Sequence, residues 1–152
     1  MNFTYQQGWS HLLRGNDYEA ADIRVLLLET DDEDPDYDTI DALLAGDAVE
    51  LSSTDYEREA ATGETIEVDD VQDQTELHID DVTFDGTAGN GINQAGSEQA
   101  VAAVVYIHLT DDTDSIPLAH LDDGGFPITP NGSDITIQWD ADGFAYIDTM
   151  PA

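Results

Sequence analysis

The sequence predicts a mainly β protein, a single-domain β-sandwich or partly closed antiparallel barrel of about eight strands with one or two short helices. The chain has 152 residues, about the length of one domain. Apolar residues make up 40% of it, which is enough for a core. From about Val49 onward, short apolar segments with a period of two alternate with turn residues. We therefore expect residues 1–152 to form one β-rich domain.

Residues 4–14 are predicted to form a short N-terminal helix. Thr4 followed by Gln7 matches the capping-box pattern that starts many helices. Gly15 is a residue type that commonly ends a helix. Apolar side chains recur at helical spacing and are expected to share one face: Tyr5, Trp9, Leu12 and Leu13.

The next segments predict a buried strand, a loop and a second short helix. Residues 23–28 are a compact apolar run, as expected of a strand buried on both faces. Residues 30–38 form an acidic segment that contains Pro35 and predicts a loop. A helix is then expected to end at Gly46, on the basis of apolar residues with a period of 3.6: Tyr37, Ile40, Leu43 and Leu44.

The middle of the chain predicts strands with alternating faces. Apolar residues alternate with polar ones in three short runs. The apolar members are Ile66 and Val68 in the first run, Leu77 and Ile79 in the second, and Val82 and Phe84 in the third. The apolar parity shifts across Asp80 and Asp81, so a bulge or a sharp bend is expected there. Residues 86–96 are glycine-rich and predict an exposed loop.

The last third of the chain predicts the centre of the sheet and a hairpin. Residues 101–109 are apolar on both faces and are the best candidate for a central strand. Residues 115–121 predict a strand that is at an edge or starts after Pro117, because proline lacks an amide donor. Asp142 and Gly143 offer a hairpin turn between two alternating segments, one with Ile135, Ile137 and Trp139 and one with Phe144 and Tyr146.

The charge is extreme and excludes several kinds of partner. Three arginines, no lysine and 35 acidic residues give a formal net charge of −32. Nucleic acid is not expected as a partner, because phosphate binding needs clustered basic residues. No apolar run is long enough to span a membrane, and the first residues lack the pattern of a signal peptide. The charge predicts a solvated acidic surface adapted to molar salt, as in an extreme halophile or one of its viruses.

Candidate metal sites in the sequence are weak. Asp34, Asp36 and Asp38 open like a calcium-binding EF-hand loop, but Thr39 and Ala45 stand where that loop needs glycine and glutamate. The acidic turn with Asp111, Asp112 and Asp114 could hold a hard cation, but such clusters arise by chance in so acidic a chain. Three histidines in strand-like segments could converge on a metal but form no spaced motif: His78, His108 and His120. Of these, His108 and His120 are expected at half-buried strand positions. No metal and no cofactor are predicted.

The sequence also predicts no enzymatic activity and no catalytic residue. It has no Gly-x-Ser-x-Gly motif, and without lysine it cannot form a phosphate-binding P-loop or a Schiff base. With no cysteine it has no thiol nucleophile, thiolate ligand or disulfide. Carboxylates are so numerous that a glycosidase-type pair stays open, but no one pair stands out.

Several segments together resemble a group of small β-rich virion structural proteins of tailed phages. The segments are DIRVLLL (22–28), DDVTF (80–84), AVVY (103–106), PLAHL (117–121) and DITIQWDADG (134–143). The likeness covers most of the chain and is most specific in its second half. It departs at residues 53–59, where the group has a glycine-rich stretch.

Together with the acidity, the resemblance implies a structural virion protein of a haloarchaeal tailed virus, assembled in the host cytoplasm. The expected role is a capsid decoration or turret subunit on the head exterior. It would form a homo-oligomer, a trimer or pentamer, that contacts the major capsid protein or neighbouring virion proteins, with Phe3, Tyr5 and Trp9 as one candidate contact surface. A tail or baseplate component is the first alternative. A halophilic host binding module or carboxylate-based hydrolase is the second.

Overall fold

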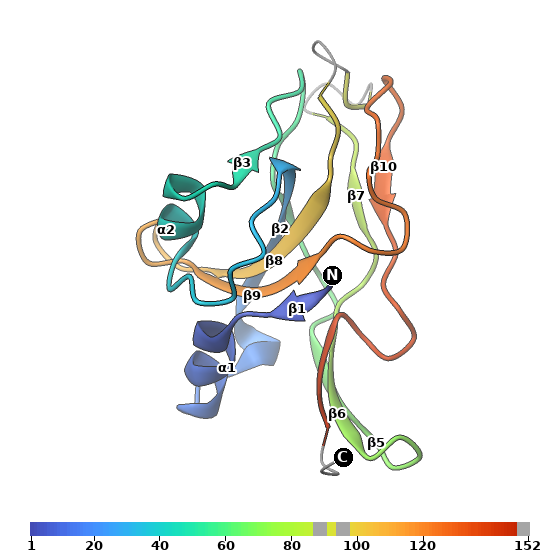
Figure 1. The fold of residues 1–152 in the computed structure, drawn as a ribbon. Helices are drawn as coiled ribbons and strands as arrows, with labels where there is room; N and C mark the ends of the chain where they lie inside the picture. Colours follow the sequence, from blue (N-terminus) through green and yellow to red (C-terminus); the bar gives the residue numbers. More distant parts are fainter. Residues whose placement is uncertain (87–90, 94–97, 149–152) are drawn as a thin grey trace.

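The computed structural model describes residues 1–86, 91–93 and 98–148 (Figure 1). Within these residues the chain is mainly β, with eleven strands in antiparallel sheets and two α-helices, which confirms the predicted fold class. The sheets of this part of the chain do not close into a barrel. The number of strands is larger than the eight expected, and three of the strands have only two residues each: β1, β3 and β4.

The largest sheet has six strands in the order β1-β9-β8-β2-β3, and β4 also pairs with β2. Its strands are β1 (Phe3–Thr4), β2 (Asp22–Thr30), β3 (Val49–Glu50), β4 (Glu59–Ala60), β8 (Ala102–His108) and β9 (Ile116–Leu121). The central pair runs in continuous register from Asp22 opposite His108 to Leu28 opposite Ala102. The predicted central strand, residues 101–109, therefore forms as β8.

Both faces of the β2–β8 pair are buried, as predicted. One face packs against apolar residues of the other sheets, among them Leu77, Phe84 and Ile135. The opposite face packs against Tyr5 and against Ile40 of α2 (Ile40–Ala45). Consecutive side chains of a strand point to opposite faces, so a strand covered on both sides must be apolar throughout. This explains the unbroken apolar runs over residues 25–28 of β2 and 102–107 of β8.

The first helix starts later than predicted. α1 spans Gln6–Leu13, and its N-cap is Tyr5, which makes no side-chain capping bond. The capping-box prediction is wrong because Thr4 belongs to β1, and its hydroxyl accepts a hydrogen bond from the Trp9 indole at 2.9 Å. Leu13 was expected on the apolar face but is 77% exposed.

The second predicted helix is confirmed as α2. Thr39 caps it by accepting a hydrogen bond from the Ala42 amide at 3.1 Å. The amide of Gly46 then bonds to the carbonyls of Ala42 and Leu43, closing the last turn. A short 3-10 helix, η1 (Tyr18–Ala20), precedes β2. No helix in the described ranges combines the length and apolarity that crossing a bilayer requires.

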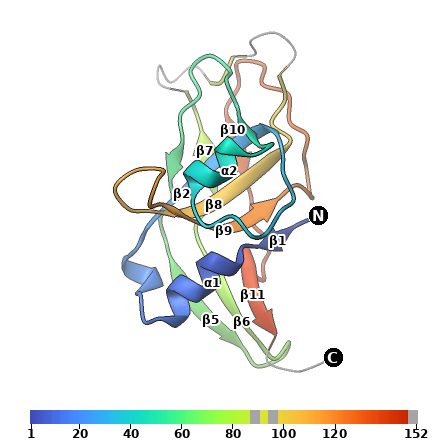
Figure 2. The ribbon, with the colours of Figure 1, turned by 60° about the vertical axis from the view of Figure 1, so that its left-hand side comes forward.

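Two smaller sheets continue one another across a bend. β7 (Val82–Phe84) pairs with β10 (Ile135–Ile137), and β5 (Thr65–Asp69), β6 (Gln74–His78) and β11 (Ala145–Asp148) form a three-stranded sheet in the order β11-β6-β5. The three-stranded sheet extends away from the six-stranded one in both views (Figures 1 and 2). Asp80 and Asp81, where a bulge or bend was predicted, lie between β6 and β7, at the point where the chain passes from the three-stranded sheet to the β7–β10 pair.

The predicted turn at Asp142 and Gly143 forms, with an isolated antiparallel bridge between Asp140 and Gly143, but the strand pairing expected on either side of it is wrong. β10 pairs with β7 and β11 pairs with β6, so the two segments expected to face each other join different sheets. Trp139 fixes this crossing, because its indole nitrogen donates to the Asp80 carbonyl at 2.8 Å.

Two further predictions need correction. β9 contains Pro117 and lies between β1 and β8, although β1 pairs only with Ala119 and His120. The β8–β9 register shifts next to Pro117 and leaves Leu118 as an extra residue, and proline is tolerated at such irregularities. The glycine-rich loop at 86–96 lies partly outside the described residues. In its described part, Ile92 is fully buried, so the loop is not wholly exposed.

Candidate functional site

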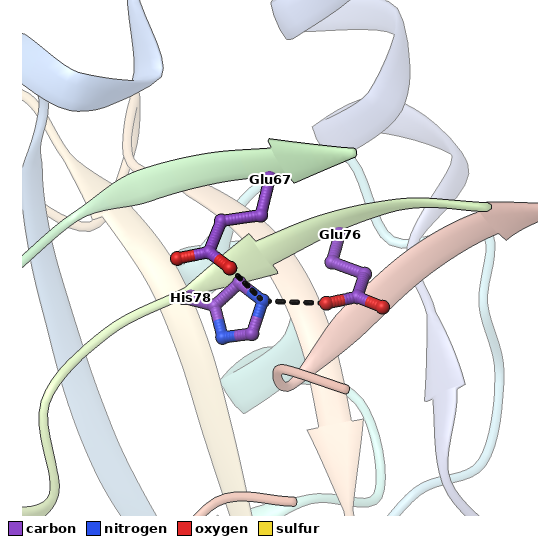
Figure 3. A group of neighbouring side chains, drawn as sticks. All are labelled: Glu67, Glu76 and His78. Carbon is purple, nitrogen blue, oxygen red and sulfur yellow. Dashed lines mark hydrogen bonds and ion pairs between the residues drawn. The ribbon is translucent and has the colours of Figure 1, made fainter. Parts of the chain in front are cut away.

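The polar face of the three-stranded sheet carries a compact cluster of ionisable side chains (Figure 3). Glu67 of β5 stands opposite Glu76 of β6, and His78 follows two residues later on the same face. The His78 Nε2 atom lies 2.7 Å from Glu76 Oε2 and 3.9 Å from Glu67 Oε2. These ligand-type atoms all lie within 4.8 Å of one another, so the cluster has the residue types of a cation site.

Glu76 is the buried centre of this cluster. It is 4% exposed, and its second oxygen accepts a hydrogen bond from Gln74 Nε2 at 2.8 Å. Asp69 and Asp142 also offer oxygens within 4.8 Å of it. Both carboxylate oxygens therefore already have partners inside the sheet. The arrangement suits a structural acid–histidine pair that satisfies a buried charge.

A second cluster joins the loop after β2 to the loop after β9. Oxygens of Asp31, Glu33 and Asp122 lie within 4.8 Å of one another. The terminal ammonium group of Met1 lies among them, bonded to Glu33 Oε1 at 3.3 Å and to Asp122 Oδ2. The Asp122 side chain is only 14% exposed, whereas that of Glu33 is 55% exposed. The cluster therefore opens to solvent on one side only.

His120 of β9 borders the second cluster from the interior. Its side chain is fully buried and stacks on the Phe3 ring, with 4.6 Å between centroids. The prediction of a half-buried histidine is therefore wrong, because β1 pairs with β9 and places Phe3 directly opposite. Neither ring nitrogen has a hydrogen-bond partner in the described structure. Burial lowers the pKa of His120, against the opposing effect of Asp122 and Asp31.

Arg58 forms a third polar cluster, which is structural. Its guanidinium donates to both oxygens of Glu50 at 2.7 Å and to both oxygens of Asp112 at 2.6 and 2.9 Å. It also lies over the Tyr106 ring, 5.6 Å from the centroid. Burial opposes its charge, but the bonds to Glu50 and Asp112 outweigh this and raise the pKa of Arg58. Sequence patterns did not single out this residue.

The acidic motifs noted in the sequence serve local structure. Asp34 Oδ1 accepts a hydrogen bond from the Asp36 amide, as in an Asx turn. Asp114 caps its own turn by accepting bonds from the Thr110 and Asp111 amides at 2.9 and 3.1 Å. Asp112 instead binds Arg58. The carboxylates of these two segments thus have intramolecular roles.

The three strand histidines do not meet. His78 contacts Glu76, His120 lies beside Phe3, and the His108 ring is 3.4 Å from the Ser115 hydroxyl. In the ranges that the structure describes, no group of potential metal ligands contains two histidines. A histidine-rich zinc or iron centre built from these three residues is therefore not formed.

The face of the three-stranded sheet opposite the Glu67 cluster is apolar and exposed. Ile66 of β5 is 47% exposed, Val68 71% and Ile147 of β11 38%. Val68 and Ile147 both stand opposite Thr75, so their side chains share this face. We call Ile66, Val68 and Ile147 the apolar sheet face. The alternation of Ile66 and Val68 with acidic residues predicted one apolar strand face, and the structure leaves that face exposed at these two residues.

The aromatic residues near the N-terminus are used inside the molecule. Tyr5 is fully buried, and the rings of Phe3 and Tyr5 meet edge to face at 5.1 Å. The Trp9 indole is bound to Thr4. These contacts leave the apolar sheet face as the better candidate for contact with another molecule.

Comparison of the chain with protein-family models, with curated proteins and with solved structures finds no match.

Proposed function

We propose that the chain is a structural protein of a haloarchaeal tailed virus, a decoration or turret subunit on the outside of the head. The observation that carries this proposal is the apolar sheet face, exposed on a sheet that extends from the body. Contiguous exposed apolar side chains on a globular protein are typical of surfaces that contact other proteins. The resemblance of five sequence segments to virion proteins of tailed phages supports the same role.

The surroundings of this face favour assembly in concentrated salt. The chain carries a formal net charge of −32, so copies repel one another at low ionic strength. The Debye length falls from ~8 Å at 0.15 M salt to ~3 Å at 1 M, which leaves only short-range repulsion. Apolar contacts then determine how subunits associate. A trimer or pentamer around a symmetry axis, bound to the major capsid protein, is the expected form.

The first experiment measures where and how often the protein occurs in purified particles. A cryo-electron microscopy reconstruction should show it on the head exterior at capsid symmetry positions, in tens to hundreds of copies. A few copies at the tail would replace the proposal with a tail or baseplate role. A protein missing from particles that turns over a small molecule would reject both.

The second experiment tests the apolar sheet face directly. In molar KCl, light scattering coupled to size exclusion should give an oligomer for the wild type and a monomer for Val68→Ser. Val49→Ser is the matched control, because Val49 is a strand valine that is also exposed, at 45%, but lies in β3. Equal oligomer populations for both variants would contradict the role of this face.

A further inference from the structure

We infer that Asp31, Glu33 and Asp122 form a binding site for a divalent transition cation, with the buried imidazole of His120 as its nitrogen ligand. The inference is independent of the proposed viral function. It rests on three observations: the spacing of the carboxylates, the unpartnered histidine beside them and the buried, unpartnered Oδ1 atom of Asp122.

The carboxylates converge from two parts of the chain. Asp31 and Glu33 follow β2, and Asp122 follows β9. Their oxygens lie within 4.8 Å of one another. Oxygens bound to one cation at about 2.1–2.2 Å can be at most about 4.4 Å apart, so small side-chain rotations suffice to close the shell. The partial exposure of Asp31 and Glu33, 35% and 55%, leaves an entry path and room for these rotations.

His120 is the observation that distinguishes this cluster from an ordinary acidic patch. A fully buried imidazole normally has a hydrogen-bond partner, and neither nitrogen of this ring has one in the described structure. The Nε2 atom lies 3.9 Å from Asp31 Oδ2, which is too long for a hydrogen bond, and it is outside the group of carboxylate oxygens that lie within 4.8 Å of one another. A cation about 2.1 Å from each atom fits that separation.

The charges around the site also favour a cation. Of the chain's arginines, Arg24 pairs with Asp22, and Arg58 pairs with Glu50 and Asp112. The Asp122 Oδ1 atom is buried and has no hydrogen-bond partner among the described residues, so a lone pair is available there.

The donor set indicates the class of cation. Carboxylate oxygens alone suit magnesium, calcium and manganese, whereas an added imidazole favours zinc and other late transition cations. Mn²⁺ is the probe of choice, because its electron paramagnetic resonance spectrum reports both the free ion and nitrogen ligands. The titration uses the full chain in molar KCl, so that weak binding to the acidic surface is screened.

The expected result is one Mn²⁺ bound above the diffuse background. Asp122→Asn should weaken this binding about 10-fold or more, on the scale of changes in metal-site residues. Asp123→Asn is the matched control, since it removes the same charge one residue away, and should change the affinity less than about twofold. Equal weakening by both variants would mean binding by overall charge, and would overturn the inference. Glu76→Gln should leave the affinity unchanged. A loss of Mn²⁺ binding in Glu76→Gln would place the ion at the cluster of Glu67, Glu76 and His78 instead, and would overturn the inference.

The nitrogen ligand has its own test. Pulsed electron paramagnetic resonance of the bound Mn²⁺ should show ¹⁴N coupling, which His120→Phe should remove along with about 10-fold of the affinity. Circular dichroism of the metal-free variants checks that each is folded. Absence of ¹⁴N coupling in the wild type, or full displacement of Mn²⁺ by an equal concentration of Mg²⁺, would show a site of oxygen ligands only and reject His120 as a ligand.

Discussion

Arg58 shows how one basic side chain organises several segments of an acidic protein. It lies just before β4 and binds Glu50 of β3 and Asp112 of the turn between β8 and β9. Both contacts are bidentate, the geometry in which guanidinium–carboxylate pairs are strongest. The guanidinium side chain is 22% exposed, so losing one partner leaves a poorly solvated charge.

The Asp112 contact predicts a specific pH dependence. The bond from Arg58 lowers the pKa of Asp112, with burial acting in the opposite direction. The folded state therefore binds this proton less readily than the unfolded state does. The stabilisation is fully present above the unfolded value of about 3.9, and is lost as pH falls through the lower folded value. We expect Asp112→Asn to reduce the free energy of unfolding by about 1 kcal/mol at pH 7, after discounting for its exposure.

Urea unfolding in constant KCl from pH 7 to pH 2 checks this prediction. The difference between wild type and Asp112→Asn should shrink below about pH 4 and then vanish. Asp70→Asn, at an exposed position in the β5–β6 turn, is the control for a charge removed at the surface. A difference that stays constant over the whole range would contradict the assigned role of Asp112.

The candidate sites illustrate what residue patterns could not reveal. His120 lies in a predicted strand, but its environment depends on Phe3, which is 117 positions earlier in the sequence and stands opposite it in the sheet. The cluster with Asp31 and Asp122 likewise joins loops far apart in the sequence. With 35 acidic residues, no spacing rule identifies which carboxylates meet. Such sites follow only from the pairing of strands.

At the scale of elements, local pattern predicted the parts whose burial is complete. The long apolar runs of β2 and β8 and the helical period of α2 are visible in the local sequence alone. β1 has two residues and exists because β9 offers an edge. The β10–β11 crossing depends on two different partner strands, so a local turn signal at Asp142 predicted the wrong pairing.

The contact of α1 with β9 gives a second prediction. A Cβ atom at Gly8 would lie 2.7 Å from Leu118 Cδ2 and 2.7 Å from the Pro117 carbonyl oxygen. Alanine is favoured over glycine within a helix by about 1 kcal/mol, but overpacking typically costs about 1–3 kcal/mol. Because one of these contacts is with backbone, we expect Gly8→Ala to lower the free energy of unfolding by about 1–2 kcal/mol.

Chemical denaturation of three proteins measures this effect: the wild type, Gly8→Ala and Ser10→Ala. Ser10 lies in the same helix, so its replacement reports helix propensity without the contact to β9. We expect Ser10→Ala to differ from the wild type by less than about 0.5 kcal/mol. A Gly8→Ala protein more stable than the wild type would show that α1 does not pack closely on β9.

At the scale of the whole molecule, a complete apolar core coexists with a strongly repulsive surface. The core includes fully buried residues on both faces of the largest sheet, such as Leu26 and Leu27. The 35 acidic residues are spread over the chain. When the histidines are neutral, three arginines are its only positively charged side chains. Core burial favours folding at any salt concentration, whereas the repulsion depends on screening. The balance between them therefore sets the conditions under which the chain folds.

This balance predicts that stability depends steeply on salt. Domains of this kind are stabilised by only about 5–15 kcal/mol, so unscreened repulsion within a chain of net charge −32 can cancel the whole margin. We expect the unfolding midpoint to fall continuously from molar KCl downward, with loss of structure below about 0.5 M, where the Debye length exceeds about 4 Å. Circular dichroism during stepwise dialysis measures this, and NaCl should act like KCl if screening is the cause. A chain that stays equally stable in low-salt buffer would show that its surface charge is balanced without brine.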